Sequence, residues 1–347
     1  MPNLVQPQDT RIHGGPDCHG TALHDFSTNS NACAPCPAAL RAIRQADASR
    51  YPDASYIELR QRLANFHKVN IARVALAGSA SEFIFRITAL AAQMAQTAGE
   101  GGKVWLPPHS YGDYAQAACA HRLTVATDAV KAQLLWACEP SSPLGWIQAG
   151  LGAMADDRAA NAMLVLDCAY EPLRLAGSPS LSSAQLKTVW QLWTPNKALG
   201  LTGMRAAYAI APLGAEAQVF QLDQLSPSWL VGTHGVALLR AWTEPGVQAW
   251  LAGSLNTLRE WKARQIALCE SMGWCCLASD ANFFCARPAL PEGVTLTQAL
   301  ADLRIQGIKL RDTASFGLGG HVRISVQAPL AQDTLHSAWQ LLPRPAA

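Results

Sequence analysis

The chain has 347 residues, of which 50% are hydrophobic and 15% are charged, a composition typical of a globular protein with a large buried core. Its formal net charge of +2 provides no electrostatic footprint for nucleic acid or an anionic membrane. No apolar run reaches the roughly 18 residues of a membrane-spanning helix, and residues 1–10 lack the apolar segment of a secretion signal. We therefore expect a cytoplasmic protein.

The first two thirds of the chain predict an α/β domain preceded by an arm. Residues 1–36 are rich in Asn, Cys, Pro and Gly without periodicity, which indicates a loop or arm. Helical spacing follows over 37–48 and 56–67, with a turn at Tyr51 between them. Short apolar runs then alternate with helical stretches over 74–210, which favours a mostly parallel sheet with helices on both faces. The predicted strands are 74–76, 103–106, 134–137, 163–167, 188–192 and 206–210, and the predicted helices are 81–94, 111–121 and 146–155.

The remaining residues predict a smaller α+β module. Residues 227–272 are long, helical and rich in Trp and Leu, as in a connector between domains. We expect three parts: an arm over 1–36, a large domain over 37–235, and a connector helix with a small domain over 236–347. Within the small domain we expect short strands at 275–277, 283–286 and 322–326, and a helix at 296–306.

Ten cysteines are scattered along the chain, several of them within apolar runs, which is typical of buried thiols. Cys33 and Cys36 have zinc-ligand spacing, with Cys18-His19 upstream. No second cysteine pair follows at the spacing of a zinc finger or ribbon. We therefore expect thiols rather than a metal site.

Two cations lie eight residues apart in a setting of small residues, Lys197 and Arg205. A lysine that forms a Schiff base must be uncharged part of the time, which a partly desolvated pocket favours. An arginine preceded by glycines suits a doubly charged phosphate, because its planar fork makes two hydrogen bonds. An isolated lysine or arginine is usually a solvated surface charge, so the pair needs further support.

That support lies upstream, where the apolar run 164–166 ends in Asp167, with Tyr170 three residues later. A buried strand that delivers an acid and a phenol to one pocket suits a pyridinium cofactor. The acid holds a proton on the ring nitrogen and the phenol bonds the ring hydroxyl. An aspartate after an apolar run can also be a simple turn residue. The joint pattern with Lys197 and Arg205 favours pyridoxal phosphate (PLP).

The motifs D-x-x-Y, T-x-x-K and G-x-R that contain these residues resemble the core of the fold-type I PLP enzymes, in the aspartate aminotransferase superfamily. The resemblance runs over nearly the whole chain. It implies PLP as the cofactor, attached covalently to Lys197, with Asp167 on the pyridine nitrogen and Tyr170 on the ring hydroxyl. It also implies that Thr194 and Arg205 hold the cofactor phosphate.

A second phosphate contact is expected where a strand meets a helix, at Gly78, Ser79 and Ala80. Small residues there expose backbone N–H groups at the positive end of the helix. An ordinary strand-to-helix turn has the same pattern, but the resembled family binds the PLP phosphate at this position. Tyr51 resembles the tyrosine that reaches the partner subunit's cofactor, which implies a homodimer with shared active sites.

The resemblance also assigns residues around the cofactor ring. It implies that Tyr111 stacks on the ring, and we take Tyr114 to be a packing residue. Residues 139–145 lie where the family has N-P-x-N-P-x-G, and Ser142 replaces the asparagine that bonds the ring hydroxyl. A serine is shorter, and would reach that oxygen through a water.

Both ends of the chain resemble the threonine-phosphate decarboxylases of cobalamin biosynthesis, which are relatives of the histidinol-phosphate aminotransferases. The opening carries His13-Gly-Gly and the segment 25–31, and the other end carries two arginines. The resemblance implies that Arg323 clamps the substrate carboxylate. Arg311 is expected to hold the substrate phosphate, with His13 and Asn31 as weaker candidates. The alternative for Arg311 is a surface charge before a loop.

We therefore expect PLP-dependent decarboxylation of L-threonine O-3-phosphate to (R)-1-amino-2-propanol O-2-phosphate. The first alternative is an aminotransferase that acts on a phosphorylated amino alcohol such as histidinol phosphate. A non-catalytic PLP-binding regulator is a third possibility, but the 36-residue arm is too short for the DNA-binding domain such regulators carry.

Overall fold

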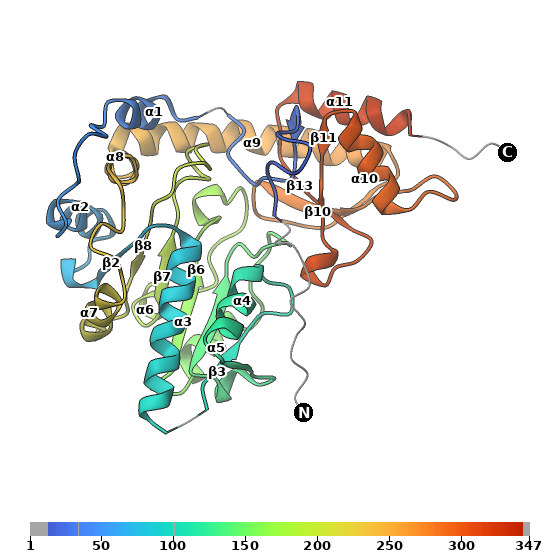
Figure 1. The fold of residues 1–347 in the computed structure, drawn as a ribbon. Coiled ribbons are helices and arrows are strands. Elements are labelled where there is room, and N and C mark those ends of the chain that lie inside the picture. The colour runs from blue at the N-terminus through green and yellow to red at the C-terminus, as the bar shows by residue number, and fades with distance from the viewer. Residues whose placement is uncertain (1–12, 34, 100, 343–347) are drawn as a thin grey trace.

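A seven-stranded sheet forms the centre of the larger domain in the computed structural model, which describes residues 13–33, 35–99 and 101–342 (Figure 1). Its strands come from the region in which strand and helix patterns alternate in the sequence. In spatial order they are β2 (Val74–Ala77), β8 (Ala207–Ile210), β7 (Trp190–Trp193), β6 (Met163–Asp167), β5 (Leu134–Cys138), β3 (Lys103–Trp105) and β4 (Thr124–Val125).

The sheet is mostly parallel. Strand β8 is antiparallel to its neighbours β2 and β7, and each of the other neighbouring pairs is parallel. Strands β5 and β6 are buried along their whole length, as continuous apolar strands are when helices cover both faces of a sheet. The predicted α/β fold class is confirmed.

Alternate residues of one strand enter different cores. In β5, Leu134 and Trp136 pack in one cluster while Leu135 and Ala137 pack in another, because successive side chains of a strand point to opposite faces. The first face is covered by α3 (Ala80–Thr97), α4 (Gly112–Ala120) and α7 (Glu216–Gln224). The second face is covered by α1 (Pro37–Arg44), α2 (Ile57–His67), α5 (Leu151–Asp157), the short α6 (Ser183–Leu186) and α8 (Thr233–Trp242).

The smaller domain is an antiparallel sheet packed against helices. Helix α9 (Pro245–Ser271) runs from the large domain into it, as Figure 1 shows. Three of the four strands of this sheet share one apolar core with α10 (Leu296–Ile305) and α11 (Pro329–Gln340). In spatial order the strands are β12 (Arg311–Asp312), β13 (Val322–Ser325), β10 (Phe283–Arg287) and β9 (Cys275–Cys276).

The N-terminal arm is anchored to the small domain. Strand β1 (His24–Asp25) pairs in parallel with β11 (Ile308–Lys309). Asp17 forms ion pairs with Arg304 and Lys309, and these two cations hold the pKa of the Asp17 carboxyl well below its usual range. The arm therefore packs against the small domain, although it comes first in the sequence. From there the chain continues to the edge of the large sheet.

Some element boundaries differ from the prediction. The helix expected over 146–155 begins at Leu151, because the backbone amide of Ser141 donates to the Trp146 carbonyl and folds the preceding residues into a loop. The helical stretch 227–272 is two helices, separated just before Pro245, which is favoured at the first position of a helix. Helix α1 ends at Arg44 rather than near residue 48. The domain boundary at 235 stays a prediction, although α8 packs in the core of the large domain.

His67, at the end of α2, gives an expected pH dependence of stability. Its Nε2 lies 2.8 Å from the Tyr208 hydroxyl, and burial lowers its pKa from 6.5 to about 4. Below pH 6.5 the unfolded chain takes up this proton before the folded chain does, so stability falls as the pH falls. We expect a loss of about 2 kcal/mol between pH 7.5 and 5.0 from this group. Urea unfolding of wild type and His67→Gln at both pH values measures it; equal pH dependence in the two proteins would contradict it.

Two further findings concern membranes and metals. No helix of the described ranges is long and apolar enough to cross a membrane. Among those residues no group of three or more His, Cys, Asp or Glu side chains is placed to hold a metal ion. All ten cysteines are free thiols, and Cys33 Sγ lies 3.6 Å from the Ser254 carbonyl oxygen.

Candidate active site

The site lies where the carboxyl ends of three adjacent strands meet. Cys138 at the end of β5 pairs with Asp167 at the end of β6, and Asp167 pairs with Leu192 of β7. Because these strands are parallel, the segments that come after them emerge at the same edge of the sheet, where ligands of open α/β sheets bind. Lys197 comes four residues after β7. The topology thus brings the predicted acid and lysine to one edge.

Asp167 is a buried carboxylate held by two donors. Its Oδ2 accepts a hydrogen bond from the Tyr114 hydroxyl at 2.7 Å, and its Oδ1 accepts from the backbone amide of Ala169 at 2.9 Å. Burial raises its pKa, whereas the Tyr114 hydrogen bond and the positive charge of Lys197 act to lower it. A carboxylate desolvated in this way is well suited to a cationic ring nitrogen.

Tyr114 is more than the packing residue we predicted. It does pack, stacking on Trp136 with ring centroids 4.3 Å apart, but its hydroxyl also fixes the orientation of Asp167. The spacing of Tyr111 and Tyr114 contained the signal, because residues three apart lie on the same face of a helix turn. That spacing directs both phenols toward the same edge of the sheet.

Lys197 is half-buried, and its Nζ lies 5.3 Å from the centroid of the Tyr170 ring. Asn196 organises the turn that presents it: Asn196 Oδ1 accepts from the amide of Lys197 at 2.9 Å and from the Thr194 hydroxyl at 2.8 Å. The Asn196 amide group donates to the carbonyls of Thr202 and Met204. We did not predict Asn196, although asparagine is a residue that stabilises turns in this way. The phosphate contact of Thr194 stays a prediction.

Tyr170 joins the large domain to the arm and the small domain. Its hydroxyl accepts from Asn29 Nδ2 at 3.4 Å, and its ring packs edge-on against Phe283 at 4.8 Å. Asn29, which we did not predict, is buried, and its Oδ1 has no hydrogen-bond partner among the described residues. A buried acceptor without a partner is costly unless a ligand or water satisfies it.

The amino-terminal turn of α3 lies beside Tyr111. Ser81 Oγ is 3.3 Å from the Tyr111 hydroxyl, so Ser81, which we did not single out, joins the expected phosphate cradle. Ser79 caps the helix by accepting from the Glu82 amide, and the Gly78 amide donates to the Glu82 carboxylate. The free backbone donors of the first turn therefore begin at Ala80 rather than at Gly78.

Arg205 and Tyr51 are placed at exposed positions. Arg205 lies just before β8, whose Ala207 pairs with Ala77 at the end of β2, so it approaches the same corner as the start of α3. Tyr51 is 76% exposed and stacks on Trp229 with ring centroids 4.4 Å apart. Their phosphate contacts, and the partner subunit that Tyr51 implies, stay predictions.

The two predicted substrate arginines are cross-strand neighbours. Arg311 on β12 pairs with Arg323 on β13, and both are buried. Like charges directly opposite each other destabilise a sheet unless something holds them. Arg323 donates to Ser142 Oγ at 3.2 Å and to the Ser27 carbonyl at 3.0 Å, and no carboxylate of the described ranges forms an ion pair with it.

Arg311, the other arginine of this pair, is also buried. Arg311 donates to Ser315 Oγ at 2.7 Å, and its guanidinium lies 4.9 Å from the Phe316 ring centroid. Burial and the charge of Arg323 lower the pKa of Arg311 to about 10. Two desolvated cations side by side are suited to an anion, whose negative charge offsets the repulsion between them.

Three predicted residues have partners within the protein. Asn31 donates to the Ala198 carbonyl and Ser254, and its backbone amide donates to the Lys197 carbonyl, so it tethers the arm to the lysine turn rather than facing a ligand. The hydroxyl of Ser142 is engaged by Arg323. His13 lies 5.9 Å from the Tyr111 ring, measured between centroids, which brings the arm to the site.

Known proteins resemble this chain in sequence and in fold. A family model for "Aminotransferase class I and II" matches residues 123–342. The chain belongs to this family. Histidinol-phosphate aminotransferase from Jannaschia sp. (strain CCS1) is 27% identical over 326 residues, covering 88% of this chain and 87% of the relative.

Two solved structures show the same fold. Histidinol-phosphate aminotransferase from Sinorhizobium meliloti, in complex with pyridoxal-5'-phosphate, has a TM-score of 0.78 at 22% identity, covering 92% of this chain and 90% of that one. L-threonine-O-3-phosphate decarboxylase from Porphyromonas gingivalis has a TM-score of 0.73 at 18% identity, covering 91% and 98%. The predicted fold-type I family is confirmed.

The cofactor of this class I/II enzyme is PLP, and the residues present fit it. The buried Asp167 carboxylate matches the ring nitrogen, the amine of Lys197 lies over Tyr170, and the first turn of α3 offers backbone donors for a phosphate. Bound here, PLP supplies an electron sink for the substrate bond that breaks.

Proposed function

We propose that this enzyme decarboxylates L-threonine O-3-phosphate to (R)-1-amino-2-propanol O-2-phosphate. The observation that carries the proposal is the buried, cross-strand pair Arg311 and Arg323. Two adjacent guanidinium groups suit a substrate with two anionic ends, and threonine phosphate carries a carboxylate and a phosphate. Histidinol phosphate has only the phosphate, so in an aminotransferase the second guanidinium would serve the carboxylates of the keto acid instead.

Each residue has a role in this reaction. Arg323 holds the carboxylate, and Arg311 holds the phosphate with His13 nearby. Breaking the bond between the carboxylate carbon and the α-carbon releases CO₂ and leaves the electron pair on the α-carbon, which must then receive a proton. Lys197 delivers that proton from its amine, which lies over the ring of Tyr170, a residue expected at the cofactor ring.

An aminotransferase on a phosphorylated amino alcohol is the second candidate. It is favoured by the relatives named histidinol-phosphate aminotransferase, which match this chain over most of their length. One assay separates the two: the protein is incubated with L-threonine O-3-phosphate, with and without 2-oxoglutarate. CO₂ release without the keto acid supports the decarboxylase. Glutamate formation that requires 2-oxoglutarate, without CO₂, supports the aminotransferase.

Arg311→Ala is expected to weaken phosphorylated ligands selectively. Hydrogen bonds to a charged group contribute about 1.5–3 kcal/mol, so the Kd for L-threonine O-3-phosphate should rise about 10- to 100-fold. The Kd for L-threonine, which lacks the phosphate, should change less than about threefold. Titration of the cofactor absorbance measures both constants. Equal weakening of the two ligands would instead assign Arg311 a structural role.

The proposed assembly is a homodimer with shared sites. Its support is the exposed aromatic pair Tyr51 and Trp229, which lies beside a groove of about 780 Å³ between α1, α2 and α8. Large exposed aromatic side chains are typical of protein–protein interfaces. Sedimentation equilibrium of the cofactor-loaded enzyme tests it, and a monomer at micromolar concentration would exclude it.

A further inference from the structure

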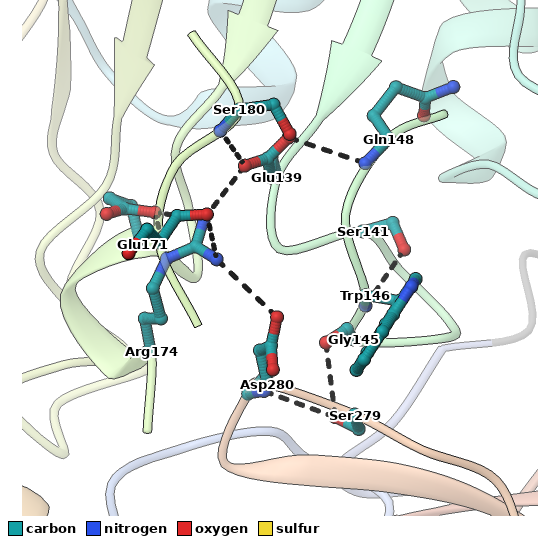
Figure 2. Close-up of polar contacts among 12 residues, drawn as sticks. Glu139, Ser141, Gly145, Trp146, Gln148, Glu171, Arg174, Ser180, Ser279 and Asp280 are labelled. Carbon is teal, nitrogen blue, oxygen red and sulfur yellow. Dashed lines mark hydrogen bonds and ion pairs between the residues drawn. The ribbon is translucent and has the colours of Figure 1, made fainter. Parts of the chain in front are cut away.

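A buried ionic cluster lies between the two domains, outside the residues assigned above. Figure 2 shows Arg174 at its centre, with carboxylates from three segments around it. Arg174 makes two hydrogen bonds to Glu171 Oε2, at 2.9 and 2.7 Å, and one to Glu139 Oε1 at 3.1 Å. Its Nη1 lies 3.8 Å from Asp280 Oδ2.

The cluster holds more negative than positive charge. The side chains of Arg174, Glu139 and Asp280 are each less than 10% exposed. Burial raises the pKa of Glu171; burial acts to lower the pKa of Arg174, but the surrounding carboxylates raise it by favouring the charged form. The guanidinium of Arg174 offsets part of the repulsion among these three carboxylates, and Lys262 adds a second positive charge near Asp280. Removing the cation of a buried pair is far more costly than removing both partners.

The three carboxylates belong to segments that must keep their relative positions. Glu139 opens the loop 139–145, which comes after β5 and contains Ser142. Asp280 precedes β10 of the small domain, and its backbone amide donates to the Gly145 carbonyl at 2.6 Å. The amide of Leu175 in turn donates to the Asp280 carbonyl at 2.6 Å. Arg174 therefore joins the start of the loop to the small-domain segment that meets its end.

The loop in turn orients the proposed carboxylate clamp. Ser142 Oγ accepts the hydrogen bond of Arg323 Nη1, and Arg323 Nε is buried without a hydrogen-bond partner among the described residues. Glu139 places a buried negative charge at the start of this loop. Arg174 pairs with that charge, and the backbone amide of Ser180 donates to it as well.

We infer that Arg174 is a positioning residue for substrate carboxylate recognition. It acts through Glu139 and Asp280, which fix the loop 139–145 and with it the hydroxyl of Ser142 that aims Arg323. The inference rests on the proposed function, in which Arg323 binds the substrate carboxylate. A displacement of about 1 Å at a binding group can cost up to about 100-fold in efficiency.

The test compares two probes with the cofactor-loaded enzyme. L-Threonine O-3-phosphate has a carboxylate, whereas O-phosphoethanolamine has the amine and phosphate without it. Stopped-flow absorbance, read before L-threonine O-3-phosphate is turned over, gives both Kd values, and their ratio measures carboxylate recognition separately from stability. For Arg174→Met we expect the Kd of the first probe to rise about tenfold, with the second within about twofold.

Three further variants keep the test decisive. Arg174→Lys retains the charge but loses the planar fork, so its ratio of the two Kd values should lie between those of wild type and Arg174→Met. Glu139→Gln/Arg174→Met removes the carboxylate together with the cation. Its ratio of the two Kd values should therefore return part of the way to that of wild type. Arg60→Met is the control, because Arg60 pairs with Asp223 in a half-buried ion pair away from the site; its ratio should equal that of wild type.

The outcomes separate the inference from the function. If the wild-type enzyme prefers L-threonine O-3-phosphate and Arg174→Met keeps the same preference, the role of Arg174 is overturned while the assignment of Arg323 stands. If Arg174→Met does not fold, an unchanged ratio in both Arg174→Lys and the double variant overturns it equally. A wild-type enzyme that binds the two probes with equal affinity overturns the assignment of Arg323, and the inference falls with it.

Discussion

Replacing Lys197 by alanine is expected to abolish the visible absorbance of the cofactor-loaded enzyme and to lower kcat by at least about 10³-fold. In the proposed function the side chain has two tasks at one atom: Nζ would attach the cofactor and move the proton at the substrate α-carbon. Among the described lysines we assign Lys197 to the site, because its Nζ lies over Tyr170 and its turn is held by Asn196.

The measurement is the absorbance spectrum of purified protein after addition of PLP and removal of the excess. Lys187→Ala is a suitable control, because Lys187 is an exposed lysine at the end of α6. An unchanged spectrum in Lys197→Ala, matching that of the control, would sink the assignment of this lysine.

Asp167→Asn is expected to produce the second largest loss, about 10²- to 10³-fold in kcat. Asparagine has the same size but cannot balance a positive charge on the ring nitrogen. The affinity for PLP should fall as well, because a charge-assisted hydrogen bond is replaced by a neutral one. Equilibrium dialysis of the cofactor measures this second effect without reference to activity.

Tyr114→Phe should show a smaller loss in the same direction, about tenfold in PLP affinity. The Tyr114 hydroxyl lowers the pKa of Asp167 against the effect of burial, so its removal favours the protonated acid. Tyr208→Phe is the matched control, since Tyr208 is a buried tyrosine whose hydroxyl contacts His67 and Trp242. If Tyr114→Phe binds PLP like the control, Tyr114 returns to the packing role predicted for it.

The sequence was sufficient to predict the sheet and the residues expected at its edge. Apolar strands buried on both faces have a continuous hydrophobic pattern, so β5 and β6 could be located without a structure. Asp167 was predictable because it is the polar residue that ends such a strand, and Lys197 because it follows in a motif of the resembled family, four residues after β7. Parallel strands place the segments after them at one edge of the sheet, whatever the details of packing.

Contacts between residues far apart in the chain could not be found in this way. Asn29 meets Tyr170 across 141 positions, and Arg323 meets Ser142 across 181. Asn31 is the reverse case: the sequence favoured a ligand contact, but Ala198 and Ser254 engage its amide. A local pattern states which chemical group is present, and does not state which groups surround it.

By itself the sequence determined the α/β fold and the family, and it predicted the acid, the lysine and the two arginines of the candidate site. Only the tertiary structure decided that Arg311 and Arg323 lie opposite each other, that Tyr114 supports Asp167, and that Arg174 balances carboxylates from both domains. The reason is physical. Periodicity and turn chemistry are local properties of the chain, whereas desolvation and charge balance depend on which distant segments are packed together.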